Sequence, residues 1–165
     1  MMVPPAKKQL FLIVALLALV AALALPARAG ELPDKSRGQT IYVPAYTQVY
    51  YSAKGETFPL VTTLMVHNTD PATEIRLESV ALYDTAGKLL RQQLPAPTSL
   101  APFATLDFLA HGLAKAQGLG ACFIVKWSAR QPVNPPLLEC LMIGTAGQQG
   151  ISFRSQGRVI AEDDR

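Results

Sequence analysis

Few residues of this 165-residue sequence have side chains that could do chemistry. The two cysteines are Cys122 and Cys140, the two histidines are His67 and His111, and Glu139 lies beside Cys140 in an apolar run. The sequence has no glycine-rich phosphate loop, serine nucleophile elbow, C-x-x-C pair or H-E-x-x-H zinc motif. It therefore predicts a protein that is not an enzyme, with no catalytic residue, no cofactor and no bound metal.

A small periplasmic copper carrier, or a small enzyme, is the alternative that these residues allow. Thiol and thioether sulfurs suit Cu(I), and Met65 and His67 would share one face of a strand because they are two residues apart. The site would combine His67 with Glu139, Cys140 and His111. In the simpler interpretation, Met65 fills a gap in the core and His67 ends a strand before a turn.

Short runs of β-branched and aromatic residues, separated by turn residues, follow one another from Gln39 onward. This spacing without a helical period predicts an all-β protein, an immunoglobulin-like β-sandwich of about seven to nine antiparallel strands. A short helix is an alternative only within Asp107–Gln117. The candidate strands are Ile41–Val43, Val49–Tyr51, Leu60–His67, Ile75–Tyr83, Leu89–Leu94, Phe103–Leu109, Leu119–Trp127, Leu137–Ile143, Ile151–Phe153 and Val159–Ile160.

Local patterns add detail to three of these strands. Gly87 stands where a hairpin loop needs a left-handed residue, so Ile75–Tyr83 and Leu89–Leu94 should pair antiparallel. Along Ile75–Tyr83, the apolar residues switch from odd to even positions partway, which predicts a β-bulge near Glu78 and Ser79. Residues at the even and at the odd positions of Leu60–His67 are almost equally apolar, so we expect a strand that is covered on both faces.

Two registers compete if the long apolar runs that contain Cys122 and Cys140 form a hairpin. In the favoured register Lys126 lies opposite Glu139, and the two charges pair on the outer face. In the alternative register the two cysteines lie opposite each other, which permits a disulfide and buries Glu139 with a raised pKa. We favour the first register because a buried, uncompensated carboxylate costs about as much as a disulfide contributes.

The favoured register also predicts an interaction surface. Side chains at alternate positions would point into the core, namely Phe123, Val125, Trp127, Leu138, Cys140 and Met142. The intervening apolar residues would surround the ion pair on the outer face, where they need a cover from another segment or from a partner protein. The candidate interaction residues are therefore Ile124, Lys126, Glu139, Leu141 and Ile143.

The first 29 residues have the composition of a signal peptide. Lys7 and Lys8 precede an apolar run, Leu10–Leu25, and Ala27 and Ala29 place small residues at the positions that a signal peptidase reads. We expect cleavage after Ala29 and export to the periplasm or beyond. The alternative is an uncleaved anchor, the one way in which this protein would contact a membrane.

Removal of the signal peptide would leave one domain without net charge. We expect a flexible leader over residues 30–38, a single domain over 39–162 and a polar tail over 163–165. The chain has 15 basic and 12 acidic residues, and three basic ones, Lys7, Lys8 and Arg28, lie in the signal peptide. The balanced mature charge gives no reason to expect nucleic acid or anionic lipid as a partner.

Six blocks of the sequence carry a family pattern. They are Ile41–Pro44, His67–Asp70, Tyr83–Lys88, Gly120–Trp127, Pro136–Thr145 and Gly150–Phe153 with the following Gly157 and Arg158. Together they resemble a bacterial family that is catalogued as domain of unknown function 3124, over nearly the whole mature chain. The resemblance implies an exported bacterial protein without an established activity. We therefore expect a non-catalytic binding or assembly module whose partner is an unknown protein or an envelope ligand.

Overall fold

The computed structural model describes Leu10 and residues 34–110, 119–145 and 150–163. The chain divides into two compact units, residues 1–32 and 33–165, and every described residue except Leu10 belongs to the second unit. The predicted signal peptide lies outside the described residues except for Leu10. No helix of the described part is long and apolar enough to cross a membrane.

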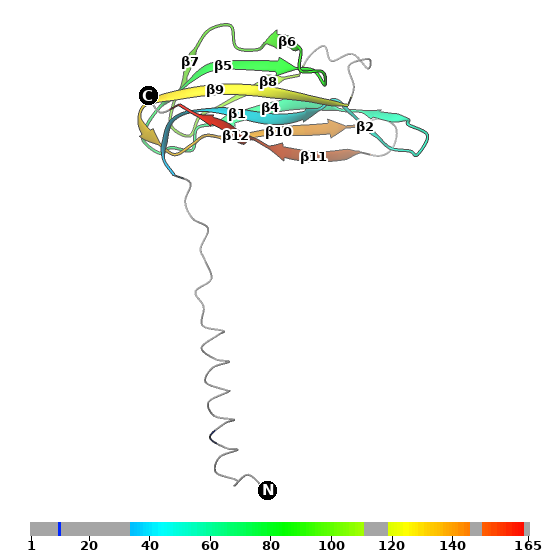
Figure 1. Cartoon of the computed structure of the whole chain (residues 1–165), viewed down its shortest axis with the longest axis horizontal. Coiled ribbons are helices and arrows are strands. Elements are labelled where there is room, and N and C mark those ends of the chain that lie inside the picture. Colours follow the sequence, from blue (N-terminus) through cyan, green and yellow to red (C-terminus); the bar gives the residue numbers. More distant parts are fainter. Residues whose placement is uncertain (1–9, 11–33, 111–118, 146–149, 164–165) are drawn as a thin grey trace. The chain divides into compact units, whose positions relative to one another are not determined.

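Twelve antiparallel strands make up the second unit in its described ranges. The larger sheet has the order β12-β1-β9-β5-β6, with β7 paired to another part of β5, and the smaller sheet has the order β11-β10-β4-β8 (Figure 1). Strands β2 and β3 form a separate ribbon. The bounds are β1 Ser36–Tyr46, β2 Gln48–Tyr50, β3 Thr57–Pro59, β4 Val61–His67, β5 Ile75–Tyr83, β6 Leu89–Gln92, β7 Thr98–Leu100, β8 Thr105–Leu109, β9 Gly120–Val133, β10 Leu137–Gly144, β11 Ile151–Gln156 and β12 Arg158–Glu162.

The all-β prediction is confirmed, and the described residues contain more strands than predicted. The two strands without a predicted counterpart, β3 and β7, are three residues long and lie in turn-rich segments. No apolar run marks such short strands, because each contributes a few backbone hydrogen bonds and little core. The helical alternative overlaps β8, and its remainder, from His111 onward, lies outside the described residues.

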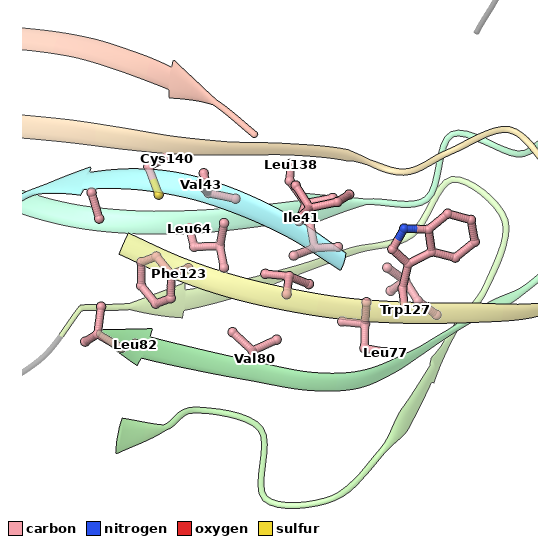
Figure 2. Packing of buried hydrophobic residues seen from close by; sticks show 14 of the residues in the cluster. Ile41, Val43, Leu64, Leu77, Val80, Leu82, Phe123, Trp127, Leu138 and Cys140 are labelled. Atoms are coloured by element: carbon pink, nitrogen blue, oxygen red, sulfur yellow. The ribbon is translucent and has the colours of Figure 1, made fainter. Parts of the chain in front are cut away.

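The inner faces of the two larger sheets form one core. Side chains alternate between buried and partly exposed along β9 and β10, as expected for strands that are covered on one face. In Figure 2, Trp127 lies at one end of the core and Phe123, Leu82 and Cys140 lie toward the other. The six side chains that we predicted to point inward from β9 and β10 are all buried.

The predicted hairpin of β9 and β10 is wrong. Strand β9 lies between β1 and β5 in the six-stranded sheet, whereas β10 lies between β11 and β4 in the four-stranded sheet. Residues Asn134, Pro135 and Pro136 carry the chain from one sheet to the other. Two consecutive prolines cannot donate the backbone hydrogen bonds of a hairpin turn, and each strand instead obtains two neighbours within its own sheet.

Two of the local predictions are confirmed. Leu77 pairs with Trp127 and Ser79 pairs with Lys126, so Glu78 is the extra residue of a β-bulge in β5. Gly87 has a φ of 76° in the turn that joins the antiparallel strands β5 and β6. This left-handed conformation suits glycine because it has no Cβ.

The folded unit extends beyond the predicted boundaries at both ends. Strand β1 begins at Ser36, whereas the predicted leader ran to residue 38. Gly38 packs so closely that a Cβ there would lie 2.8 Å from the carbonyl oxygen of Trp127. Asp163, which we placed in a polar tail, donates its backbone N–H to the Gly38 carbonyl at 2.8 Å. Both segments are polar, so their composition concealed their place in a sheet.

A polar clasp, formed by Asn68 and Asp70, holds together the loops at one end of the fold. The Asn68 side-chain amide donates to three carbonyl oxygens, at 2.9–3.1 Å, of Thr73, Leu100 and Ala101. The Asp70 carboxylate accepts from the backbone N–H groups of Ala72, Thr73 and Asn134. The clasp therefore ties the β4–β5 loop to the loops that precede β8 and β10.

We expect Asp70 to make the stability of the protein depend on pH. Hydrogen bonds from the backbone N–H groups of Ala72 and then Asn134 hold the pKa of Asp70 below its ordinary value of 3.8, against the opposing effect of burial. A carboxyl group with a depressed folded-state pKa stabilises the fold above its unfolded-state pKa, and that contribution is lost as the pH falls through the folded-state pKa.

The measurement is urea denaturation of the wild type and of Asp70→Asn between pH 7 and pH 2. We expect the difference in unfolding free energy to begin to shrink as the pH falls below about 4, where the unfolded chain becomes protonated, and to go on shrinking until the pH passes the lower folded-state pKa. Asp107→Asn, at an exposed position of β8, is the control. An Asp70→Asn difference that stays constant over this range would contradict the assignment.

Candidate functional site

The five predicted interaction residues lie on two different surfaces. Ile124 and Lys126 are on the outer face of the six-stranded sheet, and Glu139, Leu141 and Ile143 are on the outer face of the four-stranded sheet. Each residue faces outward as predicted, because its neighbours along the strand are buried. The structure does not bring the five together, because β9 and β10 are not hairpin partners.

The predicted ion pair between Lys126 and Glu139 is replaced by two others. Glu139 Oε2 accepts from Arg154 Nη1 on β11 at 2.8 Å, and the Glu139 side chain is 17% exposed. Lys126 Nζ lies 3.7 Å from Asp163 Oδ2. The glutamate within the apolar strand β10 is therefore compensated by a charge on the adjacent strand of its own sheet.

The alternative disulfide is contradicted by the positions of the thiols. Cys140 is buried on the inner face of the four-stranded sheet, whereas Cys122 is on the outer face of the six-stranded sheet, and both are free. Burial raises the pKa of Cys140 to about 12 and also raises that of Cys122. Both groups are thiols near neutral pH, and a thiol is a poor nucleophile and metal ligand.

The residues of the alternative copper site do not converge. Cys140 points into the core, whereas Glu139 points to the outer face of the same strand. Met65 and His67 share the outer face, as predicted, and Met65 pairs with Glu139. His111 lies outside the described residues. Within the described ranges, no three His, Cys, Asp or Glu side chains are grouped so that they could hold a metal ion.

An apolar patch covers the outer face of the four-stranded sheet. Its most exposed members are Val61 at 61%, Ile143 at 42% and Leu137 at 40%. Cross-strand pairing places Ile143 beside Val61, and Thr63 between Leu141 and Leu109. We use the name outer patch for Val61, Met65, Leu109, Leu137, Leu141 and Ile143.

The prediction that β4 is covered on both faces is wrong. Its inner side chains, such as Leu64 and Val66, are fully buried, whereas Val61 on the outer face is largely exposed. The apolar character of both faces therefore has two different causes, a core on one side and an open patch on the other. Because we assumed a covered strand, we did not predict Val61, Met65, Leu109 and Leu137 as interaction residues. The apolar character of both faces of β4 was the signal for Val61 and Met65.

Polar groups lie within the outer patch as well as beside it. On the outer face of β10, Glu139 lies between Leu137 and Leu141, and Met65 has Glu139 on one side and Asp107 of β8 on the other. His67 Nδ1 is 2.8 Å from Thr105 Oγ1, while His67 Nε2 is shielded from solvent and has no hydrogen-bond partner among the described residues. Apolar and polar groups are mixed in this way in many protein interfaces.

Comparisons with known proteins identify the family of the chain. No curated protein matches it. Among solved structures, the crystal structure of Thermotoga maritima 1070 is similar, with 10% sequence identity and a TM-score of 0.41, over 78% of this chain and 98% of that chain. The profile described as "Protein of unknown function (DUF3124)" matches residues 38–160. Because this match spans most of the chain, the protein belongs to the DUF3124 family.

Proposed function

We propose that the protein is an exported, non-catalytic binding or assembly module that holds a protein partner or envelope ligand against its outer patch. Its architecture in this proposal is an immunoglobulin-like β-sandwich, which is supported by two antiparallel sheets with a common core. Export to the periplasm is supported by the basic residues, apolar run and small residues of positions 7–29.

The observation that carries the proposal is the exposure of contiguous apolar side chains. Single exposed apolar residues are common on proteins, but those of the outer patch lie on three neighbouring strands. Contiguous exposed apolar surface of this kind marks interaction sites. Because these side chains are already partly covered, each contributes less than the about 1.5–3 kcal/mol of a fully exposed one, and several must be covered together to offset the cost of association.

The polar groups of the outer patch would fix the orientation of a bound partner. The Arg154 side chain is 60% exposed, so it can approach a partner while it stays paired with Glu139. Such polar contacts contribute to specificity and orientation more than to affinity.

A paired-variant experiment tests the proposal. Purified protein, expressed from the full-length sequence, is used to capture partners from a periplasmic extract of its own source cells. We expect wild type to retain a component that is lost with Val61→Asp combined with Ile143→Lys. Both side chains are exposed and the new opposite charges face each other on paired strands, so folding should change by no more than about 0.5 kcal/mol per site.

Ile160→Asp is the matched control, because Ile160 is 56% exposed but lies on β12 in the other sheet. This variant should retain the same component as wild type. The proposal would be abandoned if the outer-patch variant captured the same components as wild type, or if the Ile160 variant lost them equally.

A further inference from the structure

A polar groove lies on the outer face of the other sheet, where β9 passes between β1 and β5. One pocket of about 430 Å³ is lined by Arg37, Glu78, Lys126, Ser128, Ala129 and Asp163. A second pocket of about 200 Å³ shares Ser128 and Ala129 with the first, and its lining includes Glu74, Arg76, Ser99 and Arg130. We call the two adjoining pockets the polar groove.

Irregular pairing on both sides of β9 shapes the polar groove. Toward β5, Glu78 is the extra residue of a bulge. Toward β1, the pairs Gly38–Ser128 and Ser36–Val133 enclose one residue of β1, Arg37, but four residues of β9. Bulges redirect side chains and are frequent beside functional sites. Here they place residues of all three strands around Ser128.

The charges of the groove are only partly paired with one another. Lys126 Nζ is 3.7 Å from Asp163 Oδ2, and Arg76 Nε is 3.5 Å from Glu78 Oε1. Arg37 and Arg130 make no ion pair with any acid of the described residues. A guanidinium group binds a carboxylate through two parallel hydrogen bonds, so these two arginines are suited to an oxyanion.

The groove also contains acceptors, which a simple anion would not satisfy. Ser128 Oγ donates to Glu78 Oε1 at 2.6 Å, so the lone pairs of Ser128 stay available to accept. The carboxylates of Glu74, Glu78 and Asp163 would repel a bare anion but accept hydrogen bonds from hydroxyl groups. The matching ligand has an oxyanion and several hydroxyl donors in one molecule.

We propose that the polar groove binds a sugar acid of the uronic type. Its carboxylate binds Arg37 in the larger pocket, and its ring hydroxyls donate to Glu78, Asp163 and Ser128, which line the same pocket. The larger pocket, at about 430 Å³, has the size of a small-molecule site. This site is on the opposite sheet from the outer patch, so a test of sugar-acid binding does not depend on whether the proposed function is correct.

The test is titration of the ¹⁵N-labelled protein, expressed from the full-length sequence, at constant ionic strength. The probes are D-glucuronate, D-glucose, which lacks the carboxylate, and acetate, which lacks the hydroxyls. We expect saturating shifts of the Arg37, Ser128, Ala129 and Arg130 amides with glucuronate alone, with a Kd at or below about 10 mM. A glucuronate oligomer that binds more tightly would identify a polysaccharide as the source of the sugar acid.

Variants complete the experiment. Arg37→Gln should weaken glucuronate binding at least about tenfold, since a bidentate charge-assisted contact is lost. Arg91→Gln, at an exposed position on β6 outside the groove, should bind as wild type does. Equal shifts with acetate, equal shifts with glucose, no saturation, or unchanged binding by Arg37→Gln would each overturn the proposal.

Discussion

Replacement of Trp127 with alanine is expected to lower the free energy of unfolding by about 3–5 kcal/mol. Trp127 is fully buried and is the largest side chain of the core, where β9 passes between β1 and β5. Alanine would leave a cavity at the end of the core where Trp127 packs (Figure 2). Urea denaturation followed by far-UV circular dichroism measures the loss, because the chain has no other tryptophan for fluorescence.

Trp127→Phe is the matched comparison. The buried indole Nε1 has no hydrogen-bond partner in the described structure, and phenylalanine removes this unsatisfied donor while it keeps an aromatic ring. We therefore expect Trp127→Phe to cost less than half as much as the alanine substitution. Equal losses for the two variants would contradict this expectation.

Gly157→Val is the second substitution with a large expected effect. Gly157 separates β11, in the four-stranded sheet, from β12, in the six-stranded sheet. A Cβ at this position would lie 2.7 Å from Ile41 Cγ2 and 3.3 Å from Leu138 Cβ. Because both neighbours belong to the core, we expect destabilisation of about 1–3 kcal/mol or more, measured as a fall in thermal midpoint on the order of 10 °C.

Gly120→Val is the control for the Gly157 substitution. A Cβ at Gly120 meets no heavy atom within 4 Å, and valine is well suited to a strand. We expect a change within about 0.5 kcal/mol. A similar loss at both glycines would mean that the strands tolerate valine poorly in general and that close packing at Gly157 is not the cause.

The faces of the strands were predictable from the sequence. Alternation along β9 and β10 correctly placed Phe123, Trp127 and Met142 inside and Ile124 and Ile143 outside. Parity has a direct physical cause, since successive side chains of a strand point to opposite faces. The bulge at Glu78 was predictable for the same reason, because a change of parity requires an extra residue.

The neighbours of each strand were not predictable in the same way. Alternation assigns Glu139 to an outer face but does not specify whether Lys126 or Arg154 lies beside it. Pairing depends on long-range contacts, and adjacency along the chain is a frequent but not obligatory guide. Here the segment with Pro135 and Pro136 crosses between sheets, so the consecutive strands β9 and β10 do not pair with each other.

The polar groove had no sequence signature at all. Arg37 lies in a segment that the sequence predicts to be a flexible leader, and Arg130 lies in a polar stretch of β9 between Trp127 and Val133. The two are brought to adjoining pockets by the unequal pairing of β1 and β9, which depends on three-dimensional structure. The outer patch, in contrast, was visible in the composition of β4, but we attributed it to a core.

The continuous segment from β11 through Gly157 to β12 joins the two sheets mechanically along one side. Strand β11 pairs with β10 and β12 pairs with β1, so neither sheet can slide past the other without stretching this segment. The Gly157 N–H also donates to the Leu138 carbonyl at 2.9 Å, which fastens the crossing point itself. If a tethered partner pulled on the outer face of one sheet, part of the force would therefore be transmitted to the other sheet through the backbone around Gly157.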